Sequence, residues 1–229
     1  MGVGHVALAL GASKAAPRLN VGWLVLAALL ADFLLGIFAA VGLEHASVPP
    51  DFASRHYLLF TFPYSHGLLA LLVWAGIFGF LISRVYGTNR RVFVVVALVV
   101  LSHFLLDGLV HIAGLPLVGE NSAKFGLGLW KHMPLELALE TLMAVAGVAI
   151  YWKLEAHASA VVRYSMAIFV GFVTVATWSQ LFALTPPTPR QAKIAWLVSP
   201  LILSAIPCAL DRRRARQAIS HTEAGVHKA

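Results

Sequence analysis

One run decides the class of this protein: Val92-Phe-Val-Val-Val-Ala-Leu-Val-Val-Leu-Ser-His-Phe-Leu-Leu-Asp-Gly-Leu-Val-His111. As a helix it is long enough to cross the hydrocarbon core of a bilayer, which is about 30 Å thick. It also places His103, Asp107 and His111 on one helical face, each a little more than a turn from the next. Ionisable groups inside such a segment are costly and usually face a bundle interior, where they mark a functional site. The run therefore predicts a transmembrane helix that carries part of a polar site.

The composition supports the same class. Of the 229 residues, 59% are hydrophobic and only 12% are charged. A soluble domain with so little polar surface would not cover itself, so we expect an integral membrane protein. The formal charge of +7 does not by itself indicate nucleic acid, because Lys and Arg gather in the cytoplasmic loops of membrane proteins. The single cysteine, Cys208, excludes an intrachain disulfide.

The pattern of apolar runs predicts an all-α, polytopic membrane helical bundle. Six transmembrane helices are expected, at residues 21–41, 63–86, 92–113, 133–152, 162–184 and 192–209. A short half-helix at residues 3–15 precedes them and is too short to span. Residues 1–153 form the expected core with the polar site, residues 154–210 add two further transmembrane helices, and residues 211–229 form a disordered basic tail.

The basic residues predict the orientation of these spans. With the N-terminus and the C-terminus both cytoplasmic, twelve of the Lys and Arg residues fall on the cytoplasmic side and five on the outer side. This is the positive-inside pattern. The basic tail is expected to anchor the topology and to contact anionic membrane lipid, with no nucleic acid as partner.

Ionisable residues from four spans fall at one depth when a rise of about 1.5 Å per residue is counted from the cytoplasmic ends. Their heights lie between ~17 and ~30 Å. The set comprises Asp32, His66, His103, Asp107, His111, Glu136 and Glu140. If the N-terminal segment folds back from Lys14, His5 reaches ~14 Å, with Asp32 as its nearest candidate partner. The spacing predicts one polar cluster in the middle to outer layer of the bilayer.

Four short motifs resemble, in their order and spacing, the membrane-bound metal-dependent hydrolases of the YdjM type, which are bacterial inner-membrane proteins. The motifs are Gly4-His5, Leu29-Leu-Ala-Asp32, Ser65-His-Gly-Leu-Leu69 and Ser102-His-Phe-Leu-Leu-Asp107. The resemblance covers roughly residues 1–153, and the last two spans add nothing to it. It implies metal-dependent hydrolysis in a bacterial inner membrane.

The chain departs from that family in two places. Ala31-Asp32-Phe33 stands where the family has Pro-Asp with a further acidic residue, and Tyr64-Ser-His66 lacks the preceding His-Arg. Glu136 or Glu140 could replace the missing carboxylate. Otherwise the site binds one metal instead of two, or none.

The preferred hypothesis is an integral membrane hydrolase that cleaves a lipid or lipid-linked ester or phosphoester near the outer leaflet. The expected metal ligands are His66, His103 and Asp107, completed by Asp32 and His5. Mixed imidazole and carboxylate ligation suits zinc first, with manganese or iron as alternatives. The other candidates are Glu136 and Glu140 as general acid or base and His111, Lys131 and His132 as substrate contacts at the mouth.

Two other interpretations stay open. The same His, Asp and Glu residues could form the path of a metal-ion or proton transporter, although the cytoplasmic halves of the spans are apolar. Alternatively, they form a buried hydrogen-bonded network that sets helix register.

Overall fold

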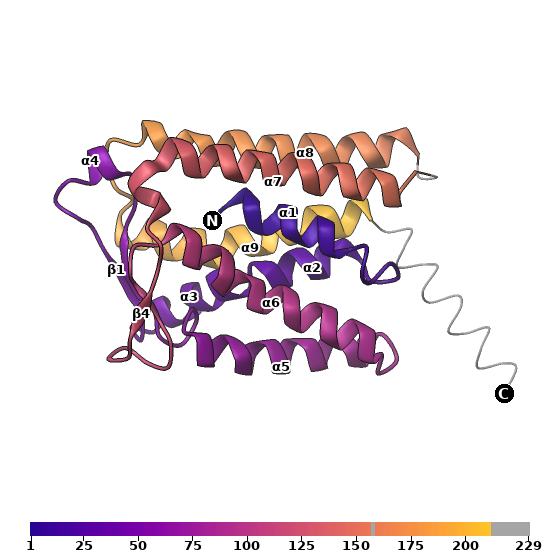
Figure 1. Ribbon diagram of the computed structural model, residues 1–229, viewed down its shortest axis with the longest axis horizontal. Coiled ribbons are helices and arrows are strands. Elements are labelled where there is room, and N and C mark those ends of the chain that lie inside the picture. Colours follow the sequence, from indigo (N-terminus) through magenta and orange to yellow (C-terminus); the bar gives the residue numbers. More distant parts are fainter. Residues whose placement is uncertain (157–158, 212–229) are drawn as a thin grey trace, which may run out of the picture.

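The structure is a computed structural model of the chain, and it describes residues 1–156 and 159–211. The predicted disordered tail therefore lies, from residue 212 on, outside the described residues. The described part is an all-α helical bundle, as the sequence predicts (Figure 1). The bundle helices are α1 (Val3–Ala12), α2 (Val21–Ala28), α3 (Leu30–Ala40), α5 (Leu68–Val85), α6 (Arg90–Val110), α7 (Met133–Leu154), α8 (Ala160–Trp178) and α9 (Pro189–Leu210).

Small elements gather at one end of the bundle, on the left in Figure 1. They include two antiparallel strand pairs, in which β1 (His45–Ser47) pairs with β2 (Leu59–Thr61) and β3 (Leu115–Pro116) with β4 (Lys124–Phe125). The short helices at this end are α4 (Phe52–Arg55), η1 (Leu129–His132) and η2 (Ser179–Phe182). We call this the strand end. The opposite end, which holds residues 13–20 and 86–89, is the turn end.

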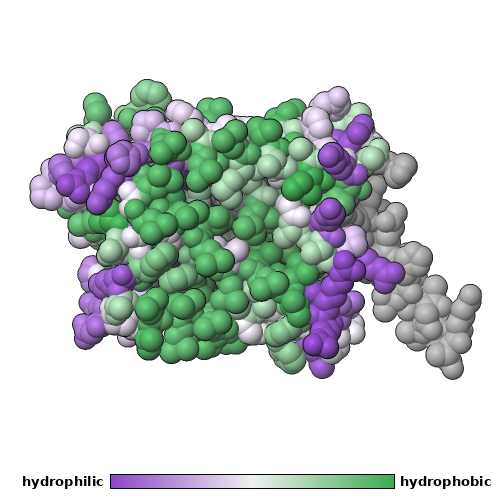
Figure 2. Space-filling model, in the orientation of Figure 1, coloured by the Kyte–Doolittle hydropathy of each residue, from purple (hydrophilic) through white to green (hydrophobic). Residues whose placement is uncertain are grey.

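Several helices could span a membrane. By length and composition, five described helices do so: α5, α6, η1 with α7, α8 with η2, and α9. The pair α2 and α3 passes the same test only when taken together, and the two helices are bent by 53° to each other, as in a broken span or a re-entrant loop. Apolar side chains cover the middle of the surface in Figure 2, and polar ones collect at its two ends. This belt is the surface that a bilayer requires.

The first predicted span, residues 21–41, is not one continuous helix. It breaks at Leu29, although neither proline nor glycine stands there. In an unbroken helix the Ala28 carbonyl would accept from the amide of Asp32, but here Nδ1 of His103 takes it, at 2.7 Å. A side chain that inserts into the helical hydrogen-bond ladder is a recognised cause of such a kink.

Helix α9 packs against both halves of this broken span. A Cβ atom added at Gly22 would lie 2.6 Å from Cα of Cys208, and one at Gly36 would lie 2.7 Å from the backbone nitrogen of Leu197. Only glycine allows approaches this close. At the turn end, the Asp211 carboxylate accepts from the backbone N–H of Val21 at 2.8 Å. The last helix therefore holds the break in place.

Helix α1 is the predicted half-helix, and it lies inside the bundle beside α7 (Figure 1). It approaches α7 closely at Gly147, where a Cβ would lie 2.6 Å from the carbonyl oxygen of Ala7. Its residues Val6 and Leu10 are completely buried. Because protein buries most of α1, a helix too short to span can be stable inside the bundle.

Candidate metal centre

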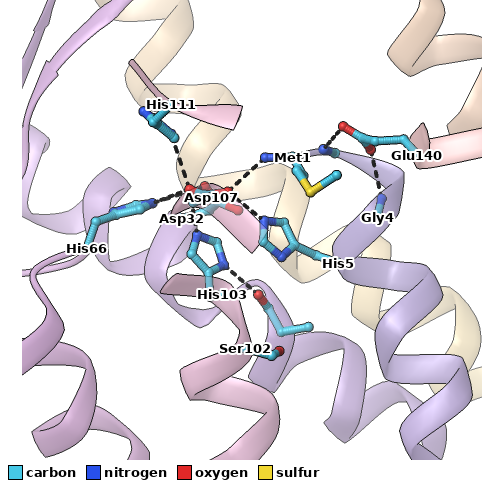
Figure 3. Close-up of polar contacts among 12 residues, drawn as sticks. Met1, Gly4, His5, Asp32, His66, Ser102, His103, Asp107, His111 and Glu140 are labelled. Atoms are coloured by element: carbon cyan, nitrogen blue, oxygen red, sulfur yellow. Dashed lines mark hydrogen bonds and ion pairs between the residues drawn. The ribbon is translucent and has the colours of Figure 1, made fainter. Parts of the chain in front are cut away.

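The histidines of the predicted polar cluster, including His5, converge on Asp107 (Figure 3). Its Oδ2 lies 3.3 Å from Nε2 of His103 and 3.2 Å from Nε2 of His111. Nε2 of His66 is 3.8 Å from the same oxygen. Oδ1 faces Nε2 of His5 at 3.1 Å. Four imidazoles from different parts of the chain thus surround one carboxylate.

Asp32, in the first turn of α3, adds the second carboxylate of the cluster. Its Oδ1 lies 3.7 Å from Nε2 of His66. The Asp32 side chain is 30% exposed, whereas those of the other residues around Asp107 are at most 7% exposed. The cluster is therefore closed except on the side of Asp32.

Two overlapping triads have the geometry of metal ligands. One is His5, His103 and Asp107, and the other is Asp32, His66 and His103; within each, the ligand atoms lie within 4.8 Å of one another. These five are the residues predicted as ligands. A buried His/Asp cluster of this kind could hold a metal ion.

The hydrogen bonds of His103 determine which of its nitrogens is free. A carbonyl oxygen only accepts, so the 2.7 Å contact of Nδ1 with Ala28 makes Nδ1 the protonated nitrogen. In the neutral ring, Nε2 then carries a lone pair. Nε2 is buried and has no hydrogen-bond partner among the described residues. A lone pair left unpaired in the protein interior is what a metal ligand presents.

His66 is oriented by a relay from Glu44 and Ser65. The Ser65 hydroxyl donates to Oε2 of Glu44 at 2.7 Å, so in its 2.8 Å contact with Nδ1 of His66 it accepts. Nδ1 of His66 therefore carries the proton, and Nε2 turns its lone pair toward Asp32 and Asp107. His66 itself lies in the turn before α5, just outside the helix that was predicted to contain it.

Glu44 is held firmly for this role. Its Oε1 accepts from the backbone N–H groups of Tyr64 at 2.7 Å and Ser65 at 2.9 Å, and the residue is 1% exposed. Burial raises the pKa of the Glu44 carboxyl, and these hydrogen bonds oppose the rise. Glu44 is not among the predicted site residues, because it lies in a loop without periodicity. Its presence could be inferred only from the donors around Ser65, which need a hydrogen-bond acceptor once they are buried.

His5 enters the cluster, but with a different partner from the one expected. It bonds to Asp107 and not to Asp32, and its ring stacks on that of His103 with centroids 4.0 Å apart. The reason lies in the attachment of α1. The Glu140 carboxylate on α7 accepts from the N–H groups of Gly2 at 2.9 Å and Gly4 at 2.7 Å, which brings His5 beside α6.

The two glutamates proposed as acid or base differ in their contacts. Glu140 is engaged by the two amides at the start of α1. Glu136, one helical turn away, is 1% exposed, and neither of its oxygens has a hydrogen-bond partner in the described chain. The α-amino group of Met1 lies 2.9 Å from Oδ1 of Asp107 and adds positive charge to the cluster.

The three expected substrate contacts are divided between two places. His111 is buried in the cluster and forms the C-cap of α6. Lys131 and His132 are exposed at the strand end, at the start of α7. The ring of Trp130 stands 4.0 Å from that of His111 and connects the two places.

Neither protein-family models, nor curated proteins, nor solved structures match this chain. The resemblance to the YdjM-type hydrolases consequently rests on the four motifs quoted above. Residues from all four motifs lie in the buried cluster.

Proposed function

We propose that the protein is an integral membrane metal-dependent hydrolase that acts on a lipid or lipid-linked ester or phosphoester near the outer leaflet of a bacterial inner membrane. The observation that carries this proposal is the buried Nε2 of His103, which makes no hydrogen bond to the described residues and lies 3.3 Å from Oδ2 of Asp107. The order of the YdjM-like motifs supports it. In this topology the turn end is cytoplasmic and the strand end faces outward.

Zinc is the ion that this donor set favours, since it accepts imidazole nitrogen and carboxylate oxygen together. Either triad would hold it, with His103 joined by His5 and Asp107 or by Asp32 and His66. Both candidate triads need the same lone pair of His103, which favours one ion over two. When bound, such an ion supplies Lewis acidity, polarising a carbonyl or phosphoryl oxygen and making water more acidic.

The remaining roles follow from the contacts of the chain. Glu136 is the better candidate for proton transfer, because its oxygens are uncommitted whereas Glu140 binds two amides. Asp32 marks the side from which a substrate reaches the cluster. A site enclosed by membrane-spanning helices suits a substrate that already resides in the bilayer.

A transporter is the competing proposal, and the surroundings of the cluster argue against it. A transport path needs polar groups between the cluster and the turn end. Three of the segments that run between them, Val6–Ala12, Val21–Ala28 and Val92–Leu101, contain no ionisable side chain. Their buried residues belong to the hydrophobic core. On α7, the buried ionisable residue nearest the turn end is Tyr151, whose hydroxyl lies 3.4 Å from the Asp211 carboxylate.

The test is the metal content of detergent-purified protein, measured by elemental mass spectrometry. Wild type is compared with His103→Ala and Asp107→Asn, and the matched control is His45→Ala, which removes an exposed histidine of strand β1. We expect near-stoichiometric zinc in wild type and in the control, and loss of zinc in both cluster variants. Metal-loaded protein is then assayed with short-chain phospholipid and lipid ester substrates.

Two outcomes would refute the proposal. If wild type holds no metal even after incubation with excess zinc and manganese, the cluster is a buried hydrogen-bonded network with a structural role. Zinc or proton flux in reconstituted vesicles, abolished by His103→Ala, would instead establish the transporter.

A further inference from the structure

A cavity lies at the strand end, outside the candidate metal centre. It has a volume of about 470 Å³ and opens between α4 and the start of α7. Its walls include Arg55, Tyr57, Trp130 and Lys131, with Met133 and Leu181 as apolar surface. A cavity of this size suits a small-molecule head group.

The charged side chains that line the cavity are all basic. Arg55 and Lys131 line it, and no acidic residue does. Arg55 is partly neutralised, since it binds the Asp51 carboxylate and donates to the Tyr57 hydroxyl at 2.8 Å. Lys131 makes no hydrogen bond or ion pair with the described residues, so its ammonium group is available to an anion. Lysine binds phosphate groups as a compact point charge.

One side of the cavity is aromatic and adjoins the metal centre. The rings of Tyr57 and Trp130 stack with centroids 5.6 Å apart. The Trp130 ring also packs on His111, at 4.0 Å, and Nε2 of His111 is 3.2 Å from Asp107. A molecule in the cavity would therefore stand one aromatic side chain away from the cluster.

We infer that this cavity binds the phosphate of an amphiphilic phosphoester, with the anion on Lys131 and Arg55 and the apolar part against Met133 and Leu181. The binding itself needs no metal. That the bound molecule is also the substrate of the adjacent centre rests on the proposed function, and it would make that substrate a molecule that carries a phosphate group.

The inference is tested by calorimetric titration of the full-length protein in a neutral detergent with a chelator present. The probes are dihexanoyl phosphatidic acid, inorganic phosphate and uncharged dihexanoylglycerol. Lys131→Gln removes the free ammonium. Lys124→Gln is the matched control, because Lys124 is an exposed lysine at the same end that does not line the cavity.

We expect phosphatidic acid to bind wild type and Lys124→Gln equally, and Lys131→Gln about tenfold more weakly, since one charge-assisted contact is lost. The affinity should also fall as salt is added. If inorganic phosphate binds as tightly as phosphatidic acid, the phosphate site is supported, and its natural ligand is a soluble phosphoester. Equal binding by Lys131→Gln and wild type, or binding of dihexanoylglycerol as tight as that of phosphatidic acid, would overturn the inference. Because the titration is metal-free, its failure and a failure of metal binding are separate results.

Discussion

Replacing Glu44 by glutamine should reverse the tautomer of His66. The glutamine oxygen can keep the two backbone N–H bonds of Tyr64 and Ser65, but its NH2 group then faces the Ser65 hydroxyl. That hydroxyl must now accept from the amide, so its own hydrogen turns to Nδ1 of His66. The ring proton moves to Nε2 and points into the cluster, which removes His66 as a ligand.

The size of the effect follows from one hydrogen bond. To recover the ligating tautomer, the variant must break the contact between Ser65 and His66, which costs about 1–3 kcal/mol in a buried site. Since about 1.4 kcal/mol is tenfold in affinity, the Kd for zinc should rise by about 5- to 150-fold. Ser65→Ala imposes no tautomer and should lose less affinity than Glu44→Gln.

The assay is a zinc titration of purified protein against a chromophoric chelator. Glu120→Gln, which neutralises an exposed carboxylate at the same end, is the control. Selective 15N labelling of histidine reports the tautomer of His66 without any metal. A Glu44→Gln protein that keeps wild-type zinc affinity and an Nδ1-protonated His66 would refute the relay.

Three further predictions concern stability, measured as melting temperature in detergent. Glu140→Gln can accept only one of the two amides at the start of α1, so it should cost about 1–3 kcal/mol; an unchanged melting temperature would show that α1 is held by packing alone. Gly36→Ala should cost about 1–3 kcal/mol or more by forcing α9 away. Its control, Gly76→Ala, meets open space and should be neutral or stabilising; equal effects would contradict the close-packing argument. Because burial raises the pKa of Glu44, the folded state binds its proton more tightly than the unfolded chain. We therefore expect the difference in melting temperature between metal-free wild type and Glu44→Gln to be largest near pH ~4. This difference should fall as the pH rises through the pKa of Glu44 in the folded state. A difference that grows with pH would refute this.

Local periodicity made much of the site predictable. His103, Asp107 and His111 lie one turn apart in a single helix, so their shared face follows from helix geometry. The rise per residue also predicted that His5 and Asp32 reach the same layer, and the structure places both in the cluster.

Contacts between distant segments were not predictable in this way. Glu44 reaches Ser65 across a loop that has no repeat pattern. The break at Leu29 has no proline or glycine to announce it, because its partner is His103 on another helix. His5 bonds to Asp107 because Glu140 on α7 binds the backbone N–H of Gly4, and this contact fixes the position of α1.

The packing of α9 on the broken span has a consequence for biogenesis. Every candidate ligand is synthesised before α9, since chains emerge from the N-terminus. Yet the two halves of the break pack on α9 at Gly22 and Gly36, and Asn20 donates to the Cys208 carbonyl at 3.1 Å. A helix without chemistry of its own is thus the last part needed to align the ligands. If the cluster holds a metal as proposed, the newly inserted protein would retain that metal only after its final span has docked.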